Sequence, residues 1–319
     1  MTSEAKNPAV SVIIPNYNYA RYLEERISSV LNQTFQDFEV ILLDDASTDE
    51  SRVILERYRE HPKVSHIVVN TENSGSPFAQ WERGMALARG RYIWIAEADD
   101  SAEPDFLEQC FKALELHPEA AIVKPMSTLI DSEGNPSEHP SFEDYEPDGS
   151  VRLLEGNELD ATYMLERNYF YNASMLLFDI RKWQTLKDRS FMRYRYTGDW
   201  LFWGLLALDE KVLEVRSRLN RFRLHGKSVT DEGHNHQKGI RVRAEAYALK
   251  YRLLKELRKR GYRVPTLPIY QMHRDLIRRP DKELIQAVER LSPDMMEELR
   301  SLPPLHYASL WLRKHLGLK

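Results

Sequence analysis

The sequence predicts an α/β fold in which a mostly parallel sheet is flanked by helices and followed by a helical appendage. Short apolar runs alternate with amphipathic helical patterns through about the first 125 residues. Helices between short apolar strands are typical of βαβ crossovers, which build parallel sheets covered on both faces. After about residue 226 the strand patterns stop and helical spacing continues alone. With 319 residues, the chain can form one large domain and an appendage.

The apolar runs of the first half predict the strands, and helical patterns separate them. We expect strands at residues 10–15, 38–43, 64–69, 91–96 and 121–125. Between these strands we expect a helix through residues 23–31, a helix that begins at residues 47–50, and a helix at 78–88 that Gly90 ends. Residues 47–50 are Ser-Thr-Asp-Glu, which indicates a capping box. Pro104 fits the first turn of the fourth helix.

The second half is less regular. Its expected elements are a long loop at 127–160, a strand at 169–178, an apolar helix at 201–208, a helix at 240–257 that ends at Gly261, and helices that start at Asp281 and at Ser292-Pro293. A loop as long as the first of these is usually functional in a compact domain. We therefore expect one domain at residues 1–225, in two halves at about 9–126 and 127–225, and a helical C-terminal region at 226–319.

The composition limits where the protein works. It has 42% hydrophobic and 29% charged residues, as is usual for a soluble globular protein. The single cysteine excludes an internal disulfide framework and fits a reducing compartment. No secretory signal precedes the first strand, and no run of 18 apolar residues is present. We expect a cytoplasmic protein, with the inner face of the membrane as an alternative location.

The charge is divided unevenly along the chain. Residues 226–319 carry 20 Lys and Arg against 11 Asp and Glu, a balance of +9, which leaves −13 for residues 1–225. The acidic part argues against a nucleic-acid partner, whereas the basic C-terminal region could make peripheral contact with anionic lipids. The amphipathic tail at 302–319 points the same way. The alternatives are that the basic side chains solvate helices and that the tail packs against the appendage.

Polar clusters follow three of the expected strands, at Pro15-Asn16-Tyr17-Asn18, Asp44-Asp45-Ala46-Ser47 and Glu97-Ala98-Asp99-Asp100. Because parallel strands end at one edge of a sheet, we expect these clusters to meet there. Tyr17 offers an aromatic face for a base, and Asp45 can accept a hydrogen bond from a ring N–H. Asp99 and Asp100 can hold ribose hydroxyls and a diphosphate bound to Mg²⁺ or Mn²⁺, which prefer such oxygen ligands. The alternative is that the clusters make turns and helix caps.

These clusters, with Leu31-Asn32-Gln33-Thr34-Phe35, give residues 9–225 a combined signature that resembles family 2 glycosyltransferases of the GT-A (Rossmann-like) fold. The resemblance implies an inverting transfer of a sugar from a UDP- or dTDP-linked donor to a hydroxyl of a glycan or lipid-linked glycan acceptor. A setting in bacterial surface polysaccharide synthesis is an analogy with similar proteins. Residues 127–170 and the region around Tyr194 to Trp200 are expected to recognise the acceptor.

The resemblance also implies roles for single residues. Asp45 reads the pyrimidine base, and Asp99 and Asp100 hold ribose and metal. Glu97 occupies the first position of the DXD-type motif and is a further candidate ligand of the metal. Asp199 matches the catalytic base, although Gly198 stands where many relatives have Glu; an N-cap role for Asp199 is the alternative. The remaining candidates are His225 for the metal or diphosphate, and Pro15, Asn18, Asn73 and Arg83 for the nucleotide. The alternatives are a surface histidine near a loop for His225, a plain turn for Asn73 and a solvated helix charge for Arg83.

Two other functions are alternatives. A sugar-1-phosphate nucleotidyltransferase would carry a glycine-rich basic loop after the first strand, and this chain has Asn16-Tyr17-Asn18-Tyr19 there. A nucleotide- or carbohydrate-binding module would bind a sugar nucleotide without turning it over. Replacing Asp199 separates that module from an enzyme that uses Asp199 as its base.

Overall fold

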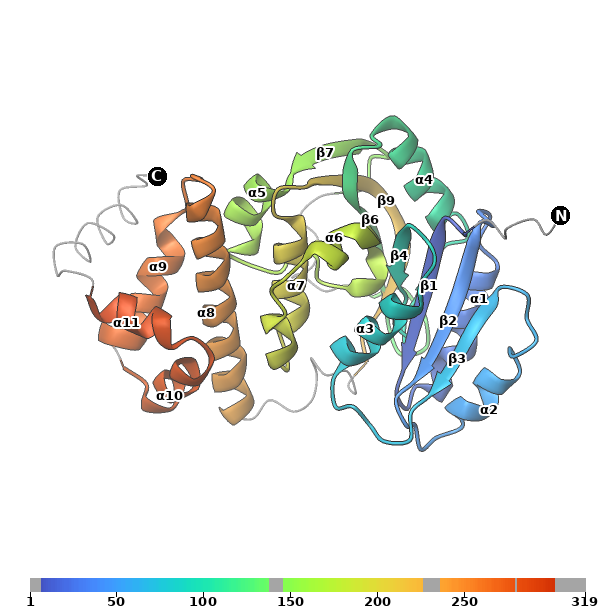
Figure 1. The fold of residues 1–319 in the computed structure, drawn as a ribbon, viewed down its shortest axis with the longest axis horizontal. Coiled ribbons are helices and arrows are strands. Elements are labelled where there is room, and N and C mark those ends of the chain that lie inside the picture. Colours follow the sequence, from blue (N-terminus) through green and yellow to red (C-terminus); the bar gives the residue numbers. More distant parts are fainter. Residues whose placement is uncertain (1–6, 138–145, 226–235, 279, 302–319) are drawn as a thin grey trace. The chain divides into compact units, whose positions relative to one another are not determined.

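The computed structural model describes residues 7–137, 146–225, 236–278 and 280–301 (Figure 1). The chain forms two compact units. The sheet unit comprises Met1–Leu154, Phe170–Lys187 and Glu210–His225, and the helical unit comprises Glu155–Tyr169, Asp188–Asp209 and Gly226–Lys319. The helical unit therefore includes two segments that precede the boundary expected at residue 225. The expected tail at 302–319 lies outside the described residues.

The sheet unit is built on a sheet with the strand order β3-β2-β1-β4-β8-β6-β9-β5, and β7 pairs with β9. The strands are β1 Val10–Asn16, β2 Phe38–Asp44, β3 Val64–Val69, β4 Tyr92–Ile95, β5 Ser101–Ala102, β6 Ala120–Ile130, β7 Val151–Glu155, β8 Leu177–Asp179 and β9 Lys211–Arg223. The first four pair in parallel, as do β6 and β9, while β8 is antiparallel to β4 and β6. The expected mostly parallel sheet is confirmed.

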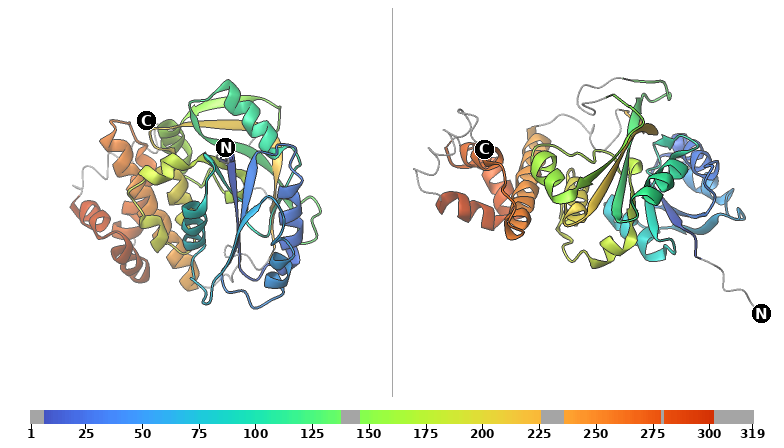
Figure 2. Two further views of the ribbon diagram at one scale, coloured as in Figure 1. Left: turned by 45° about the vertical axis from the view of Figure 1, so that its right-hand side comes forward. Right: turned by 90° about the horizontal axis from the view of Figure 1, so that it is seen from above.

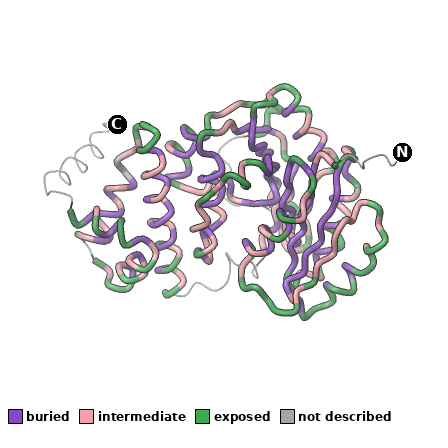
Figure 3. Tube along the Cα trace, viewed as in Figure 1, coloured by how far each residue is buried: buried purple, intermediate pink, exposed green. Residues whose placement is uncertain are grey.

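Helices cover both faces of the parallel strands (Figure 2). They are α1 Ala20–Leu31, α2 Ser51–Glu56, α3 Pro77–Leu87 and α4 Phe106–Leu116, with α6 Ile180–Thr185 after β8. Val12 and Ile14 point to the face where α1 and α4 complete the core, and Ile13 points to α3 on the other face. Gly84 of α3 lets Ile13 approach, because a Cβ at that position would overlap the Ile13 side chain. Strands β1 and β2 are buried along their whole length (Figure 3).

The helical unit packs around α8. Its elements are α5 Gly156–Leu159, a π-helical turn at Asp160–Met164, a 3₁₀ turn at Ser190–Arg193, α7 Gly198–Ala207, α8 His236–Lys259, α9 Thr266–His273, a π-helical turn at Arg274–Arg278, α10 Lys282–Leu291 and α11 Pro293–Ser301. Asp281 caps α10 through the N–H groups of Glu283 and Leu284, as predicted. Gly261 ends the α8 segment with a φ of 76°. None of the helices in the described residues is both long and apolar enough to span a bilayer.

Several local predictions were wrong. The second helix begins at Ser51 rather than in a capping box, because the Ser47 hydroxyl accepts the N–H of Asn18 instead of capping a helix. The fourth helix starts at Phe106, two residues after Pro104. Strands occupy part of the loop expected at 127–160, since β6 runs to Ile130 and β7 spans Val151–Glu155. In the segment 169–178, only the end joins a strand, β8.

Candidate active site

The three polar clusters lie at one edge of the sheet. In the parallel register Asn16 pairs with Asp44, and Ile13 of the same strand pairs with Ile95 at the end of β4. Asn16 joins the first two clusters directly, because its amide donates to Asp44 Oδ2 at 2.9 Å and to Ser47 Oγ at 3.1 Å. The carboxyl ends of β1, β2 and β4 therefore bring their loops to the edge where open α/β sheets bind ligands.

Asp45 is buried and holds the loop that follows β3. Its carboxylate accepts hydrogen bonds from Asn70 Nδ2 at 2.7 Å, Gln80 Nε2 at 2.8 Å, and the Ser74 N–H and hydroxyl at 2.9 and 2.7 Å. Asn73 donates to the backbone carbonyl of Asp45 at 3.1 Å. Three of the four carboxylate bonds go to Oδ1 and one goes to Oδ2. Asp45 is thus fixed in place, with Oδ2 the less engaged oxygen.

The other residues expected near the nucleotide differ in exposure. Tyr17 is 45% exposed, so its ring is open to a ligand. Asn18 has a φ of 60°, and its side-chain oxygen accepts the Thr48 N–H at 2.7 Å, which ties the first loop to the second. Pro15 lies inside β1 opposite Leu43. Arg83 of α3 donates to Asn70 Oδ1, next to the Asp45 network.

Asp99 pairs with His225. His225 Nε2 lies 2.9 Å from Asp99 Oδ2, and the imidazole packs against the rings of Tyr19 and Tyr22, with centroids 5.5 and 5.4 Å away. Tyr19 hydrogen-bonds Asp99. Burial, then the charges of Asp99 and Glu97, raise the pKa of Tyr19 far above its usual value, so its hydroxyl stays protonated and donates.

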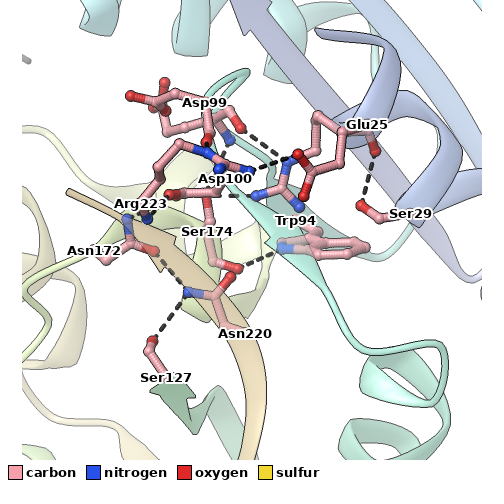
Figure 4. Close-up of polar contacts among 12 residues, drawn as sticks. Glu25, Ser29, Trp94, Asp99, Asp100, Ser127, Asn172, Ser174, Asn220 and Arg223 are labelled. Carbon is pink, nitrogen blue, oxygen red and sulfur yellow. Dashed lines mark hydrogen bonds and ion pairs between the residues drawn. The ribbon is translucent and has the colours of Figure 1, made fainter. Parts of the chain in front are cut away.

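Asp100 turns inward instead. Its oxygens accept the Arg223 N–H at 2.9 Å and Asn172 Nδ2 at 2.8 Å, and the residue is 1% exposed (Figure 4). Burial, then the charge of Asp99, raise the pKa of Asp100 to about 6. Glu97 accepts from Trp81 Nε1 at 2.8 Å, and burial, followed by Asp99, raises its pKa to about 8. The three acids of this cluster therefore have different surroundings.

Two buried arginines, which the sequence did not single out, offset the charge of these acids. Arg26 of α1 is fully buried, donates to the Glu97 carbonyl at 2.8 Å and lies 3.9 Å from Asp100 Oδ2. Arg223 donates to the Asp99 carbonyl at 2.7 Å and to Glu25 Oε2 at 2.6 Å (Figure 4). The signal for Arg26 was its place on the buried stripe of α1, because a cation in such a stripe needs an anionic partner.

The donor set at Asp99 and His225 fits a divalent ion shared with a substrate. Within the described ranges, no group of three or more His, Cys, Asp and Glu side chains is arranged to hold a metal. Oδ2 and Nε2 are 2.9 Å apart. Neighbouring ligands of an octahedral ion at about 2.1 Å are roughly 3 Å apart. Mg²⁺ and Mn²⁺ commonly take a few protein ligands and complete their shell with phosphate oxygens and water.

Asp199 belongs to the helical unit and is the second residue of α7, whose N-cap is Thr197. The N-cap alternative for Asp199 is therefore wrong. Its Oδ2 accepts from Asn168 Nδ2 at 3.0 Å, and its carboxylate also accepts the Trp200 N–H. Burial raises the pKa of Asp199 to about 6, against these hydrogen bonds. Near neutral pH the group is ionised and more basic than an exposed aspartate.

Known proteins share this sequence pattern. The model of the family "Glycosyl transferase family 2" matches residues 11–176. A chondroitin synthase of Escherichia coli is 38% identical over 129 residues, which are 40% of this chain and 18% of that protein. TuaG of Bacillus subtilis, a glycosyltransferase named for teichuronic acid biosynthesis, is 40% identical over 102 residues, 32% of this chain and 40% of TuaG. This chain thus spans less than half the length of either relative.

Solved structures share the fold. TarS 1–349 of S. aureus, in complex with UDP-GlcNAc, has a TM-score of 0.59 and 19% identity over 97% of this chain and 92% of that one. The mannosyltransferase PcManGT from Pyrobaculum calidifontis, in complex with GDP-Man and Mn²⁺, has a TM-score of 0.54 and 18% identity over 99% and 82% of the two chains. The GT-A fold expected from the sequence is confirmed. Because the family model spans more than half of the chain, the protein belongs to glycosyl transferase family 2.

Proposed function

We propose that this family 2 glycosyltransferase takes a UDP- or dTDP-sugar as donor and transfers the sugar, with inversion, to a hydroxyl of a glycan or lipid-linked glycan. The observation that carries the proposal is the pairing of Asp99 with His225 at the edge of the sheet that also presents Asp45 and Tyr17. Such a site can bind a base and a diphosphate together. The structures of TarS and PcManGT, which hold nucleotide sugars, support a donor of this class.

Tyr17 and Asp45 would hold the base. The exposed ring of Tyr17 can stack on a flat heterocycle. Asp45 Oδ2 accepts from Ser74 Oγ, and a carboxylate oxygen can accept a second bond, which the ring N–H of a pyrimidine would supply. Asn73 and Arg83 lie in the network that fixes Asp45, so they would shape the base pocket.

Asp99 and His225 would hold the divalent ion, and Asp99 also lies where ribose hydroxyls would bind. When bound, Mg²⁺ or Mn²⁺ offsets the negative charge that develops on the departing nucleoside diphosphate. Asp100 and Glu97 would support this site, because their oxygens already accept hydrogen bonds from protein groups.

Asp199 would act as the general base. The acceptor oxygen attacks the anomeric carbon, the bond between that carbon and the diphosphate oxygen breaks, and its electron pair leaves with the diphosphate. The acceptor proton passes to the Asp199 carboxylate. A single displacement of this kind inverts the anomeric configuration. The raised pKa of Asp199, about 6, suits a base that works near neutral pH.

The acceptor and the location are inferred by analogy. The relatives named for chondroitin synthesis and teichuronic acid biosynthesis support a role in polysaccharide synthesis. We propose that the reaction takes place in the cytoplasm, at the inner face of the membrane when the acceptor is lipid-linked. The basic balance of residues 226–319 supports contact with anionic lipid.

The first experiment compares Asp199→Asn with Asp209→Asn, a matched change just beyond the other end of α7. UDP-GlcNAc, UDP-glucose, dTDP-glucose and GDP-mannose are screened by thermal shift with Mn²⁺, since a donor raises the melting temperature by mass action. Nucleotide release is then measured for the best donor. Asp199→Asn should keep the thermal shift and lose about 10²–10⁴-fold in release. Asp209→Asn should match the wild type.

The outcomes separate the candidate functions. Unchanged release by Asp199→Asn would remove this residue from the mechanism. Binding of nucleotide sugars without release by the wild type would favour a binding module. Release of pyrophosphate from a nucleoside triphosphate and a sugar phosphate would favour a nucleotidyltransferase.

A further inference from the structure

Glu245, in the middle of α8, binds the backbone just before α7. Its carboxylate accepts three consecutive N–H groups, from Arg195 at 2.9 Å, Tyr196 at 2.8 Å and Thr197 at 3.1 Å. The Glu245 side chain is fully buried. Arg241, one turn earlier on α8, contacts the same carboxylate at 3.0 Å from a half-exposed position. A buried anion here is therefore satisfied mainly by main-chain donors of another segment.

These N–H groups form a concave anion site at the start of a helix. Successive N–H groups that point to one place bind a carboxylate well, and the positive end of the α7 dipole favours a negative charge there. Thr197, the N-cap of α7, has a buried hydroxyl without a hydrogen-bond partner in the part of the chain that the structure describes. The α8 carboxylate thus supplies the anchoring that the local cap does not.

The segment that Glu245 holds leads directly to Asp199. Thr197 gives its N–H to Glu245, and Asp199 is two residues later, in the first turn of α7. Asn168 meets the Asp199 side chain at 3.0 Å. The backbone of Asp199 is therefore fixed through α8, and its carboxylate is oriented by Asn168.

We propose that Glu245 is a positioning residue for the reaction, which sets the backbone that aims Asp199 at the acceptor hydroxyl. The inference rests on the proposed function, because it assumes Asp199 as the base. It also gives the C-terminal helical region a part in catalysis, since the residue that fixes the backbone before the base lies on α8. Glu245 itself does not touch the reacting atoms.

A second tether between the same segments provides a control. Asp188 accepts from Arg252 Nε of α8 at 2.7 Å, and it also accepts the Ser190 N–H at 2.8 Å. Asp188→Ala removes an acid that links this segment to α8 but leaves the N–H groups of residues 195–197 bound. A general effect of loosening the segment from α8 would appear in both variants.

The experiment uses the full chain with the substitutions Glu245→Ala, Glu245→Gln and Asp188→Ala. Nucleotide release is measured with Mn²⁺ and UDP-GlcNAc, UDP-glucose or dTDP-glucose, and amide hydrogen exchange is followed at residues 195–200. Glu245→Ala should lower kcat about 100-fold with little change in the donor KM, as a small misplacement of a reacting group can do. Glu245→Gln keeps one acceptor oxygen and should fall between Glu245→Ala and the wild type. Exchange at 195–197 should quicken in both.

The outcomes are distinct. If Glu245→Ala does not fold, Glu245→Gln decides by the same criteria. A kcat equal to that of the wild type in a folded Glu245 variant, or an equal kcat loss in Asp188→Ala, overturns the positioning role. If the wild type releases no nucleotide from any of these donors, the proposed function has failed instead. If Asp199→Asn abolishes release while the Glu245 variants keep it, the proposed function stands and the inference is wrong.

Discussion

His225 Nε2 contacts Asp99 Oδ2 at 2.9 Å across 126 positions of sequence. The contact joins His225, two residues beyond β9, to the loop after β4, and the rings of Tyr19 and Tyr22 pack against the imidazole from the side of α1. An imidazole nitrogen and a carboxylate oxygen at this separation form a ready pair of ligands.

Chelation and the loss of His225 should both lower activity. EDTA should stop nucleotide release, and added Mn²⁺ should restore it. His225→Ala should raise the Mn²⁺ concentration needed for half-maximal release by at least about tenfold, because the ion would lose one of the two protein ligands proposed for it. A Mn²⁺ titration of nucleotide release measures this. His66→Ala, in β3 of the same unit, is the control and should leave the titration unchanged. Full release in EDTA would contradict the metal role.

The rate should fall in acid. Burial raises the pKa of Asp199 to about 6, and a general base must be unprotonated to accept the acceptor proton. Below pH 6 the protonated fraction grows, so kcat should drop about tenfold for each further pH unit. A kcat profile from pH 4.5 to 8 checks the position of this limb. The residual activity of Asp199→Asn should lack it, and an identical limb in that variant would assign the titration to another group.

Neighbouring acids should respond differently to the same change. Asp100→Asn replaces an oxygen acceptor with an NH₂ group beside the N–H of Arg223 or the amide of Asn172, and it removes the charge next to buried Arg26. We expect a loss of about 2 kcal/mol or more in the free energy of unfolding, measured by urea. Asp99→Asn should instead raise the Mn²⁺ concentration needed for half-maximal nucleotide release, with a smaller loss in the free energy of unfolding. The reverse assignment of effects would show that Asp100 is the metal ligand.

Asp160 should reduce stability at neutral pH. It is fully buried in the π-helical turn after α5, and neither carboxylate oxygen has a hydrogen-bond partner within the described residues. Burial raises its pKa well above the usual 3.8, so folding at pH 7 takes up a proton that the unfolded chain does not hold. Asp160→Leu should raise the free energy of unfolding by about 1–3 kcal/mol at pH 7.

The pH dependence gives Asp160 a second test. The cost of neutralising this carboxyl is absent only well below the usual pKa of 3.8, and it grows as the pH rises above that value, because the unfolded group ionises. Urea unfolding at several pH values should therefore show the advantage of Asp160→Leu widening toward neutral pH. Asp160→Asn keeps the unpaired polar atoms but should flatten the change in the free energy of unfolding with pH. A slope equal to that of the wild type would mean that Asp160 is ionised in the fold.

The sequence was most informative where structure is local. Apolar runs predicted β1, β2 and β4, because strands buried on both faces carry mostly apolar side chains, and the half-buried edge strand β3 was still visible from its Val and Ile residues. Strand β9 was missed, since it carries buried polar residues such as Glu214 and Asn220 among its apolar ones. The expected cap at Ser47 was wrong because a distant residue, Asn18, uses the hydroxyl. Local patterns do not show such competition.

The candidate site was predictable in composition but not in detail. The acids at strand ends were visible in the sequence, and the parallel register brings them to one edge. Which of Asp99 and Asp100 faces His225 depends on Asn172 and Arg223, which lie far along the chain. Arg26 and Glu245 were not foreseen, because a buried charge has meaning only once its partners are known.

The chain passes several times between its two units, which limits how this protein can be truncated. The backbone leaves the sheet unit twice, at 155–169 and 188–209, before it enters the C-terminal helices. A chain that stops at His225 would keep α7 but lose α8. Leu253 of α8 packs so closely on Gly204 of α7 that a Cβ added at Gly204 would lie 2.9 Å from the Leu253 Cδ atoms. The apolar face of α7 would then meet water. No single cut in the chain separates the two units, because each unit is built from several chain segments. Exchanging parts between relatives should therefore work better by grafting loops than by joining an N-terminal piece of one protein to a C-terminal piece of another.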